Sequence, residues 1–196
     1  FCRALCRNLL AFARTRPFKP GSETPFNVRN VIEGTLDICE ARLRDAGIST
    51  QIDVPTDLHL TGDSTALRQV VMNLSLNAAD AMNEAGHGGK IHVAGKLLPQ
   101  GGIELTFSDD GPGMSQEVAR LAFDPLYSTK ETDKGSGLGL YVVQRIVDGA
   151  GGMIHLETSP GRGASFRIVL PDAMAQLGSE EISPMDVADH WQGEVQ

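Results

Sequence analysis

Cysteine is scarce in the 196-residue sequence: Cys2, Cys6 and Cys39 are the only three, and no two of them form a CxxC pair. An odd count without such a pair argues against a disulfide framework and a zinc site, and it suits a reducing cytoplasm. No apolar run approaches the roughly 18 residues of a membrane span, and no signal peptide opens the chain. The chain also does not begin with Met, so we expect a cytoplasmic piece of a longer protein whose membrane anchor, if it has one, lies upstream.

Positive charge is the second scarcity, because 17 Lys and Arg stand against 25 Asp and Glu, for a formal net charge of -8. This balance provides no general basic field for nucleic acid or anionic lipid. We therefore expect no nucleic-acid partner and expect any phosphate to be bound by a local site. Residues 172–196 contain six acidic residues and no Lys or Arg, so we interpret them as an acidic tail or linker.

The length fits one domain with appendages. Residues 1–16 read as the end of a helix that starts upstream, residues 17–25 as a linker, and residues 26–171 as the domain. Within the domain, apolar periodicity predicts helices over 28–46, 64–82 and 140–149 and strands over 48–54, 58–62, 90–97, 102–108, 153–158 and 164–170. This order predicts a mixed sheet covered by helices.

Polar residues form a stripe on the helix expected over residues 64–82. Gln69, Asn73, Asn77 and Asp80 are spaced four, four and three residues apart, so they share one flank beside the apolar face. Asparagine is unfavourable inside helices because its amide competes for backbone hydrogen bonds. The stripe is either a solvated face or a set of amide oxygens that complete the shell of a hard cation such as Mg²⁺.

The segment DDGPGM, residues 109–114, follows an expected strand. Apolar side chains of residues 103–107 alternate onto one face, and Asp109 falls on that same face. A buried carboxylate needs a hydrogen-bond donor, and the exocyclic amine of adenine fits. Gly111 and Gly113 allow the backbone to turn sharply and to approach a ligand closely. By itself the motif is weak, because many acidic turns look like it.

The segment GSGLGL, residues 135–140, stands immediately before an expected helix. Glycines free backbone amides, and the helix start adds the positive end of its dipole, so the two suit phosphate oxygens. The segment lacks the GKS or GKT of a P-loop and does not follow a strand as a dinucleotide fingerprint does. A flexible glycine turn is the alternative.

Between the two glycine motifs lies FDPLYSTK, residues 123–130. Its Lys130 can reach a phosphate, and its Phe123 and Tyr127 can fold the segment back against the domain.

In the order NLSLNAADAM, DDGPGM, FDPLYSTK and GSGLGL, these segments resemble the N box, first glycine box, F box and second glycine box of sensor histidine kinases. The closing GRGASFRIVLP is similar to the last turn and strand of the same ATP-binding catalytic domain, so the resemblance covers residues 26–171. Residues 1–16 resemble the end of the dimerisation helix that precedes this domain. The F-box and second glycine segments look closest to the nitrogen-regulation and oxygen-sensing branches.

The resemblance implies a two-layer α/β sandwich of the Bergerat type, in the GHKL superfamily. Such a domain has a mixed five-stranded sheet, three main helices and a mobile ATP lid. It also implies that the γ-phosphoryl group of ATP is transferred to a His on an upstream dimerisation domain and thence to a response regulator, by a protein that is a homodimer at full length.

Carried over by position, Asn77 and Asn73 would hold Mg²⁺ near the phosphates, and Asp109 would accept a hydrogen bond from the adenine amine. Lys130 would neutralise charge on the transferred phosphoryl group, so Asn73, Asn77 and Lys130 are the expected catalytic residues. The other expected contacts to the nucleotide are Gly111, Gly113, Phe123, Gly135, Ser136, Gly137, Leu138, Gly139 and Ser165.

The sequence departs from the family pattern in places. Asp80 stands where many members have Lys, which puts a phosphate contact from that position in doubt. Ala164 stands where Thr is frequent, so a hydroxyl contact to the base would come from Ser165 or from water. The family's phosphoacceptor His precedes an acidic residue, and no His here does, so we expect the acceptor upstream. The five histidines are His59, His87, His92, His155 and His190.

Two other classes of function are alternatives. ATPases of the same fold carry a Glu one turn before the metal-binding Asn to activate water, and here that position is Asn73, whose amide cannot act as a general base. This disfavours hydrolysis and leaves a serine kinase of the same fold as an option. A non-catalytic partner-binding module would be marked by loss of the Asn, Asp and glycine positions, and all of them are present.

Overall fold

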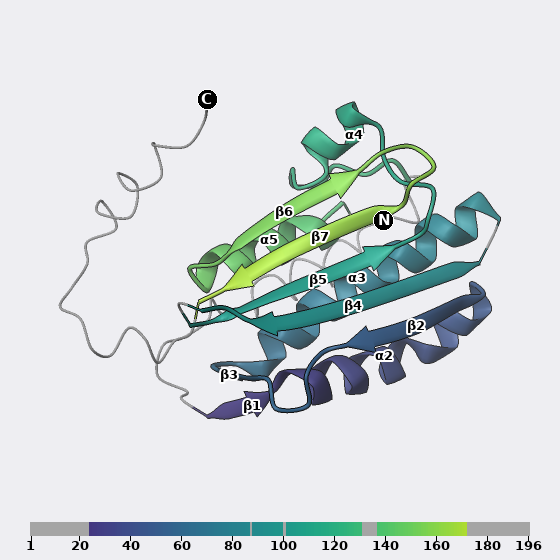
Figure 1. The fold of residues 1–196 in the computed structure, drawn as a ribbon. Helices are drawn as coiled ribbons and strands as arrows, with labels where there is room; N and C mark the ends of the chain where they lie inside the picture. Colours follow the sequence, from purple (N-terminus) through teal and green to yellow (C-terminus); the bar gives the residue numbers. More distant parts are fainter. Residues whose placement is uncertain (1–23, 87, 100, 131–136, 172–196) are drawn as a thin grey trace, which may run out of the picture.

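A computed structural model of the chain describes residues 24–86, 88–99, 101–130 and 137–171. The predicted helix end over residues 1–16 and the acidic tail over residues 172–196 lie outside these ranges. Figure 1 labels the elements, which are β1 (Pro25–Asn27), α2 (Val28–Asp45), β2 (Ile48–Asp53), β3 (His59–Thr61), α3 (Ser64–Ala85), β4 (Gly89–Leu97), β5 (Ile103–Asp109), α4 (Gln116–Leu121), α5 (Gly139–Gly149), β6 (Met153–Thr158) and β7 (Ala164–Leu170).

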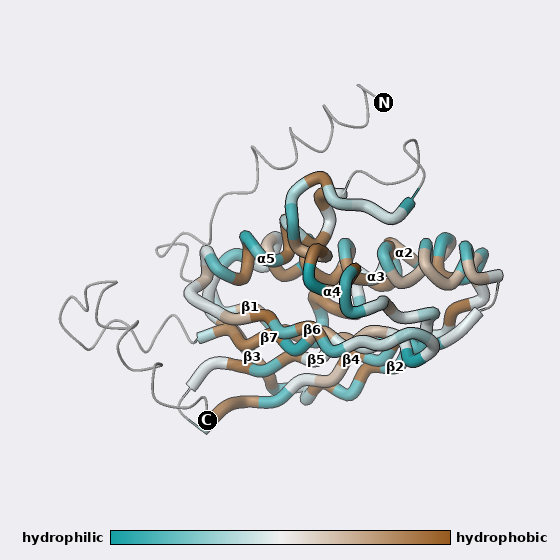
Figure 2. Tube along the Cα trace, turned by 90° about the horizontal axis from the view of Figure 1, so that it is seen from above, coloured by the Kyte–Doolittle hydropathy of each residue, from teal (hydrophilic) through white to brown (hydrophobic). Residues whose placement is uncertain are grey.

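The described part of the chain forms two layers. A five-stranded sheet of order β2-β4-β5-β7-β6 makes one layer, and α2, α3 and α5 cover one face of it (Figures 1 and 2). β2 and β4 run parallel, whereas the other neighbouring strands are antiparallel. The structure thus confirms the mixed five-stranded sheet and the three main helices.

Two short elements were not predicted from the sequence. β1 pairs antiparallel with β3 in a separate two-stranded sheet, so the strand expected over residues 58–62 is shorter and lies outside the main sheet. α4 is a six-residue helix that begins where the Ser115 side chain accepts a hydrogen bond from the backbone N–H of Val118, at 3.2 Å. Apolar periodicity becomes visible over about 4–8 residues in a strand and 11–18 residues in a helix, and both elements are shorter than that.

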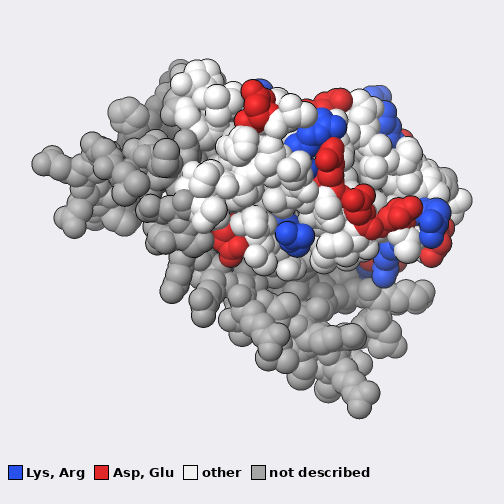
Figure 3. All heavy atoms as spheres, turned by 90° about the horizontal axis from the view of Figure 1, so that it is seen from below, with Lys and Arg blue, Asp and Glu red and all other residues white. Residues whose placement is uncertain are grey.

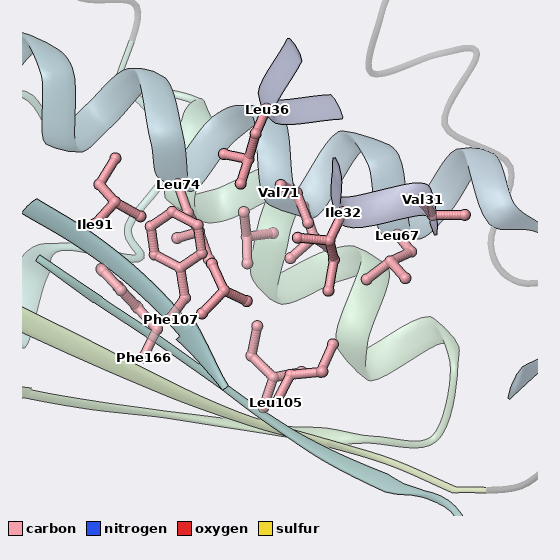
Figure 4. Close-up of a cluster of buried hydrophobic side chains, with 14 of the residues drawn as sticks. Val31, Ile32, Leu36, Leu67, Val71, Leu74, Ile91, Leu105, Phe107 and Phe166 are labelled. Atoms are coloured by element: carbon pink, nitrogen blue, oxygen red, sulfur yellow. The ribbon is translucent and has the colours of Figure 1, made fainter. Parts of the chain in front are cut away.

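The core lies between the helices and the sheet (Figure 4). Each buried aliphatic or aromatic side chain contributes about 1.5–3 kcal/mol relative to exposure. Cys39 of α2 is buried in the same core as a free thiol, and burial raises its pKa, as expected of a structural cysteine. In the core, side chains from both long helices and from three strands meet: Val31, Ile32, Leu36, Leu67, Val71, Leu74, Ile91, Leu105, Phe107 and Phe166.

α3 is the central helix of this arrangement, and it packs against both α2 and α5. It begins where the Asp63 carboxylate accepts a hydrogen bond from the Thr65 N–H at 2.8 Å, and it ends at Gly86, which is left-handed with φ of 71°. The helix therefore runs one turn beyond the predicted residues 64–82, because no helix-breaking residue precedes Gly86. With its apolar face fixed in the core, α3 presents the polar stripe along one flank.

None of the described helices is both long enough and apolar enough to cross a membrane. On the face seen from below, Lys and Arg side chains lie in small groups among acidic and uncharged ones (Figure 3). Charges of both signs thus alternate on that face.

Candidate functional site

The polar stripe of α3 contains a buried donor with no acceptor in the described part of the chain. Asn73, Asn77 and Asp80 are all half-buried, and the amide nitrogen Nδ2 of Asn73 has no hydrogen-bond partner among the described residues. A buried polar group left unpaired costs roughly 1–3 kcal/mol. A ligand that offers an oxygen next to Asn73 would remove this cost, which favours a binding site over a merely solvated face.

Asn77 lies against the first residue of α5. A Cβ atom added to Gly139 would stand 3.4 Å from both Oδ1 and Nδ2 of Asn77, so glycine leaves open the space that a side chain would fill. Leu138 occupies the N-cap of α5 without a side-chain capping bond. Helix starts attract anions through their backbone N–H groups and dipole. An amide oxygen and an anion-attracting helix end therefore adjoin at this point.

The segment that follows α4 is tied to the segment that enters α5. The backbone N–H of Leu126 donates to the carbonyl of Gly137 at 3.0 Å, and both residues have positive φ, 67° and 63°. A side chain at Gly137 would overlap the backbone of Leu126. Gly137 is therefore required for this close approach. Of the predicted glycine-motif residues, Gly135 and Ser136 lie outside the described part of the chain.

Asp109 lies at the end of β5, where its carboxylate meets backbone donors. Its Oδ1 accepts a hydrogen bond from the N–H of Gly111 at 3.0 Å, and the N–H of Ala164 is a second donor. Burial raises the pKa of Asp109; the bonds from Gly111 and Ala164 oppose this rise, and the negative charge of Asp110 adds to it. A Cβ atom on Gly111 would stand 2.8 Å from Asp109 Oδ1, so this glycine keeps the carboxylate accessible.

The loop after β5 is fixed to the turn between β6 and β7. The hydroxyl of Thr158 accepts a hydrogen bond from the N–H of Met114 at 3.0 Å and donates to the carbonyl of Gly163 at 2.6 Å. Gly113 has a φ of 66°, and a side chain there would overlap the Ser159 carbonyl. The sequence analysis missed Thr158, because its neighbours on the chain give no sign of a contact that spans 44 residues.

Phe123 and Ser165 were both expected to contact the nucleotide, and the structure places them differently. Phe123 is half-buried and packs against the core, so the segment of residues 123–130 folds back on the domain as predicted. Ser165 lies beside Asp109's partner Ala164, but its hydroxyl is 3.0 Å from that of Ser108. Because neighbouring strand residues point to opposite faces, Ser165 points away from the face that carries Asp109. The expected contact from Ser165 to the base does not fit this geometry, so we exclude it from the site.

Lys130 forms an ion pair that the sequence analysis did not anticipate. Its Nζ lies 2.7 Å from Oδ2 of Asp80 on α3. The sequence showed Asp80 only as a departure from a common Lys, and no local pattern connects two residues fifty positions apart. The structure thus brings Lys130 to the polar stripe of Asn73 and Asn77.

The comparisons with known proteins identify the family of the chain. Residues 62–174, more than half of the chain, match the family described as "Histidine kinase-, DNA gyrase B-, and HSP90-like ATPase". The chain is 33% identical over 192 residues to the sensor kinase CckA of Brucella abortus, which covers 91% of this chain and 20% of that protein. It is 41% identical over 146 residues to the sensor histidine kinase ZraS of Klebsiella oxytoca. The matched region covers 74% of this chain and 30% of that protein. The chain therefore spans less than a third of the length of either relative.

A solved structure shows the same likeness in three dimensions. The chain is similar to the mycobacterial sensor histidine kinase MprB with a TM-score of 0.64 and 29% identity, over 76% of this chain and 97% of that one. The family match includes every segment of the site described above, from the stripe on α3 to the turn before β7. The chain belongs to the family of histidine kinase-, DNA gyrase B- and HSP90-like ATPases and carries an ATP-binding domain of the sensor histidine kinase type.

Proposed function

We propose that this domain binds ATP with Mg²⁺ and transfers the γ-phosphoryl group to a His on an upstream dimerisation domain, from which a response regulator receives it. The observation that carries the proposal is the close approach of Asn77 to Gly139, which brings a polar helix flank to the start of α5. The buried and unpaired Asn73 amide beside it supports the same assignment, because a phosphate oxygen would supply its missing acceptor.

The base is proposed to bind at the other end of the site. Asp109 would accept a hydrogen bond from the adenine amine, and Gly111 and Gly113 would form the adjoining wall. The fixed position of the Asp109 carboxylate, held by two backbone donors, supports this role. Phe123 and the backbone of Gly137, Leu138 and Gly139 are proposed as the remaining contacts. Gly135 and Ser136 stay predictions from the resemblance.

The cation site is proposed to use amide oxygens. Within residues 24–86, 88–99, 101–130 and 137–171, no three or more His, Cys, Asp or Glu side chains gather as metal ligands. The side chain of Asn77, with Asn73 one turn earlier, would supply protein oxygens, and phosphate and water oxygens would complete the shell. Mg²⁺ prefers such oxygen ligands and keeps several waters. When bound, it would neutralise phosphate charge.

The residues favour transfer over hydrolysis. The amide of Asn73 cannot take a proton from water, and catalysis of phosphoryl transfer consists mainly of positioning and charge neutralisation. The acceptor nitrogen would bond to the γ-phosphorus as the bond to the bridging oxygen of ADP breaks. Asn73, Asn77 and Lys130 would hold the phosphates in line for this step.

The partners and the location belong to the same proposal. The chain spans less than a third of the length of either relative, so the dimerisation domain, the homodimer and the response regulator are assigned to the full-length protein. We propose that the domain works in the cytoplasm, where ATP is available and where a free thiol such as Cys39 is stable.

The test is a transfer assay with γ-labelled ATP and Mg²⁺. The chain should bind ATP by calorimetry but should not label itself, and adding the full-length protein's dimerisation hairpin should yield an acid-labile phosphohistidine on that hairpin. Label on a serine would indicate a serine kinase, and steady release of phosphate without the hairpin would indicate an ATPase. Failure to bind ATP would leave only a partner-binding module.

A further inference from the structure

Asp80 on α3 forms ion pairs with two basic side chains from other parts of the chain. Its Oδ2 lies 2.7 Å from Lys130 Nζ, and its Oδ1 lies 2.5 Å from Arg42 Nη2 on α2. The side chains of Lys130 and Asp80 are only 17% and 20% exposed, whereas that of Arg42 is 62% exposed. Solvent screens exposed ion pairs strongly. The pair with Lys130 is therefore the sheltered and better-defined one of the two.

The pair stands next to the proposed phosphate site. Asp80 follows Asn77 by three residues, so both side chains lie on the same flank of α3. Asn77 in turn adjoins Gly139 at the start of α5. We propose that Asp80 is a positioning residue that holds Lys130 beside the phosphates of the bound nucleotide. This inference rests on the proposed function, and it assigns a role to a residue that the family resemblance left without one.

The chemistry of the two groups supports the role. A lysine ammonium has three donors, so one bond to Asp80 leaves two for phosphate oxygens. The lysine stem is long and flexible, and holding it in place before the nucleotide arrives reduces the ordering required on binding. Asp80 by itself would repel phosphate. Its ion pair with Lys130, however, offsets this charge.

Calorimetry of the whole chain with ATP and Mg²⁺, and separately with adenosine, tests the inference. Asp80→Asn and Lys130→Gln should each weaken ATP binding by about 10- to 150-fold, the range expected for a charge-assisted hydrogen bond. The double variant should lose no more than the larger single loss, because the two residues act as a unit. Adenosine affinity should stay unchanged in all three variants, because adenosine has no phosphates.

Two matched variants separate this role from simpler ones. Glu84→Gln makes the same charge change at an exposed position one turn further along α3, and it should alter ATP affinity by less than about twofold. Arg42→Gln removes the solvent-exposed partner and should also have a small effect. Thermal unfolding of each variant, followed by circular dichroism, establishes that it is folded.

Three outcomes would overturn the inference alone. Tighter ATP binding by Asp80→Asn would mean that Asp80 withholds Lys130 from the nucleotide. Additive losses in the double variant would mean that the residues act independently, and a loss in Arg42→Gln equal to that in Asp80→Asn would mean that Asp80 only joins α2 to α3. A wild-type chain that binds no ATP would instead refute the proposed function, and this inference with it.

Discussion

Asp109 and Ala164 lie opposite each other across β5 and β7, and the backbone N–H of Ala164 donates to the Asp109 carboxylate. With the bond from Gly111, this contact fixes the carboxylate at the end of an otherwise apolar strand face. The ligand-free domain therefore contains a partly buried carboxylate. Two predictions follow from it, one on binding and one on stability.

Asp109→Asn should weaken ATP binding by about 1.5–3 kcal/mol, which is roughly 10- to 150-fold. Asparagine preserves the shape of the side chain but replaces one acceptor oxygen with a donor that cannot bond to the adenine amine. Calorimetry measures the loss. Asp110→Asn, at the exposed neighbouring position, is the matched control and should bind ATP nearly as the wild type does. Equal affinities of wild type and Asp109→Asn would show that Asp109 does not bind the base.

The same substitution should raise the stability of the ligand-free domain in a pH-dependent way. Because burial raises the pKa of Asp109 in the folded state, the folded chain binds more protons than the unfolded chain between the ordinary and the raised pKa. The free energy of unfolding of the wild type therefore falls as pH rises through this window. The asparagine side chain does not titrate, so the free energy of unfolding of Asp109→Asn should not fall in this pH range. The variant should therefore be more stable relative to the wild type above this pH range than below it. Urea unfolding at a series of pH values checks this, and a constant difference would contradict it.

Asn77→Ala should abolish the enhancement of ATP binding by Mg²⁺ while leaving adenosine binding in place, because the amide is assigned to the metal and phosphates. We expect a loss of about tenfold or more in the presence of Mg²⁺, equivalent to at least ~1.4 kcal/mol. The comparison is titration with and without Mg²⁺. Asn83→Ala, exposed in the last turn of the same helix, is the control. A normal Mg²⁺ effect in Asn77→Ala would exclude Asn77 as a ligand.

Gly161 and Gly163 provide a matched pair in the turn between β6 and β7. Both have positive φ, 75° and 66°, but a side chain at Gly161 meets no atom within 4 Å, whereas one at Gly163 would overlap the Asp109 carbonyl. Gly161→Ala should destabilise the fold by about 1–2 kcal/mol, the cost of the left-handed conformation. Gly163→Ala should destabilise it more and should also weaken ATP binding, because the end of β5 must shift. Equal losses in urea unfolding would contradict this reading.

The main elements of the fold could be predicted because each has a clear period. β5 alternates buried and half-buried residues from Ile103 to Phe107, and α2 begins at Val28, the first residue of the predicted helix. β1 has only three residues and α4 only six, too few for a pattern to be visible. That β3 joins β1 instead of the main sheet depends on long-range packing, which local periodicity does not encode.

The site could be predicted where a motif is local and not where it depends on contacts distant in sequence. The spacing of Asn73 and Asn77 on α3 was enough to place both on one flank. The pairing of Lys130 with Asp80 joins two elements and required the structure. Ser165 was assigned by its nearness to Ala164 in sequence, but the alternation of β7 directs it to the other face.

The hydroxyl of Thr158 holds one side of the candidate site more firmly than the other side is held. By bonding to both Met114 and Gly163, it couples the loop after β5 to the β6–β7 turn, so this side moves as one body. Residues 115–126 are less firmly packed, since α4 has no fully buried residue and Leu126 is 63% exposed. Entry and exit of a ligand would therefore displace this less firmly packed side of the site and leave the side held by Thr158 in place. Substitutions in residues 115–126 can then change the rates of ligand exchange without changing the position of the Asp109 carboxylate.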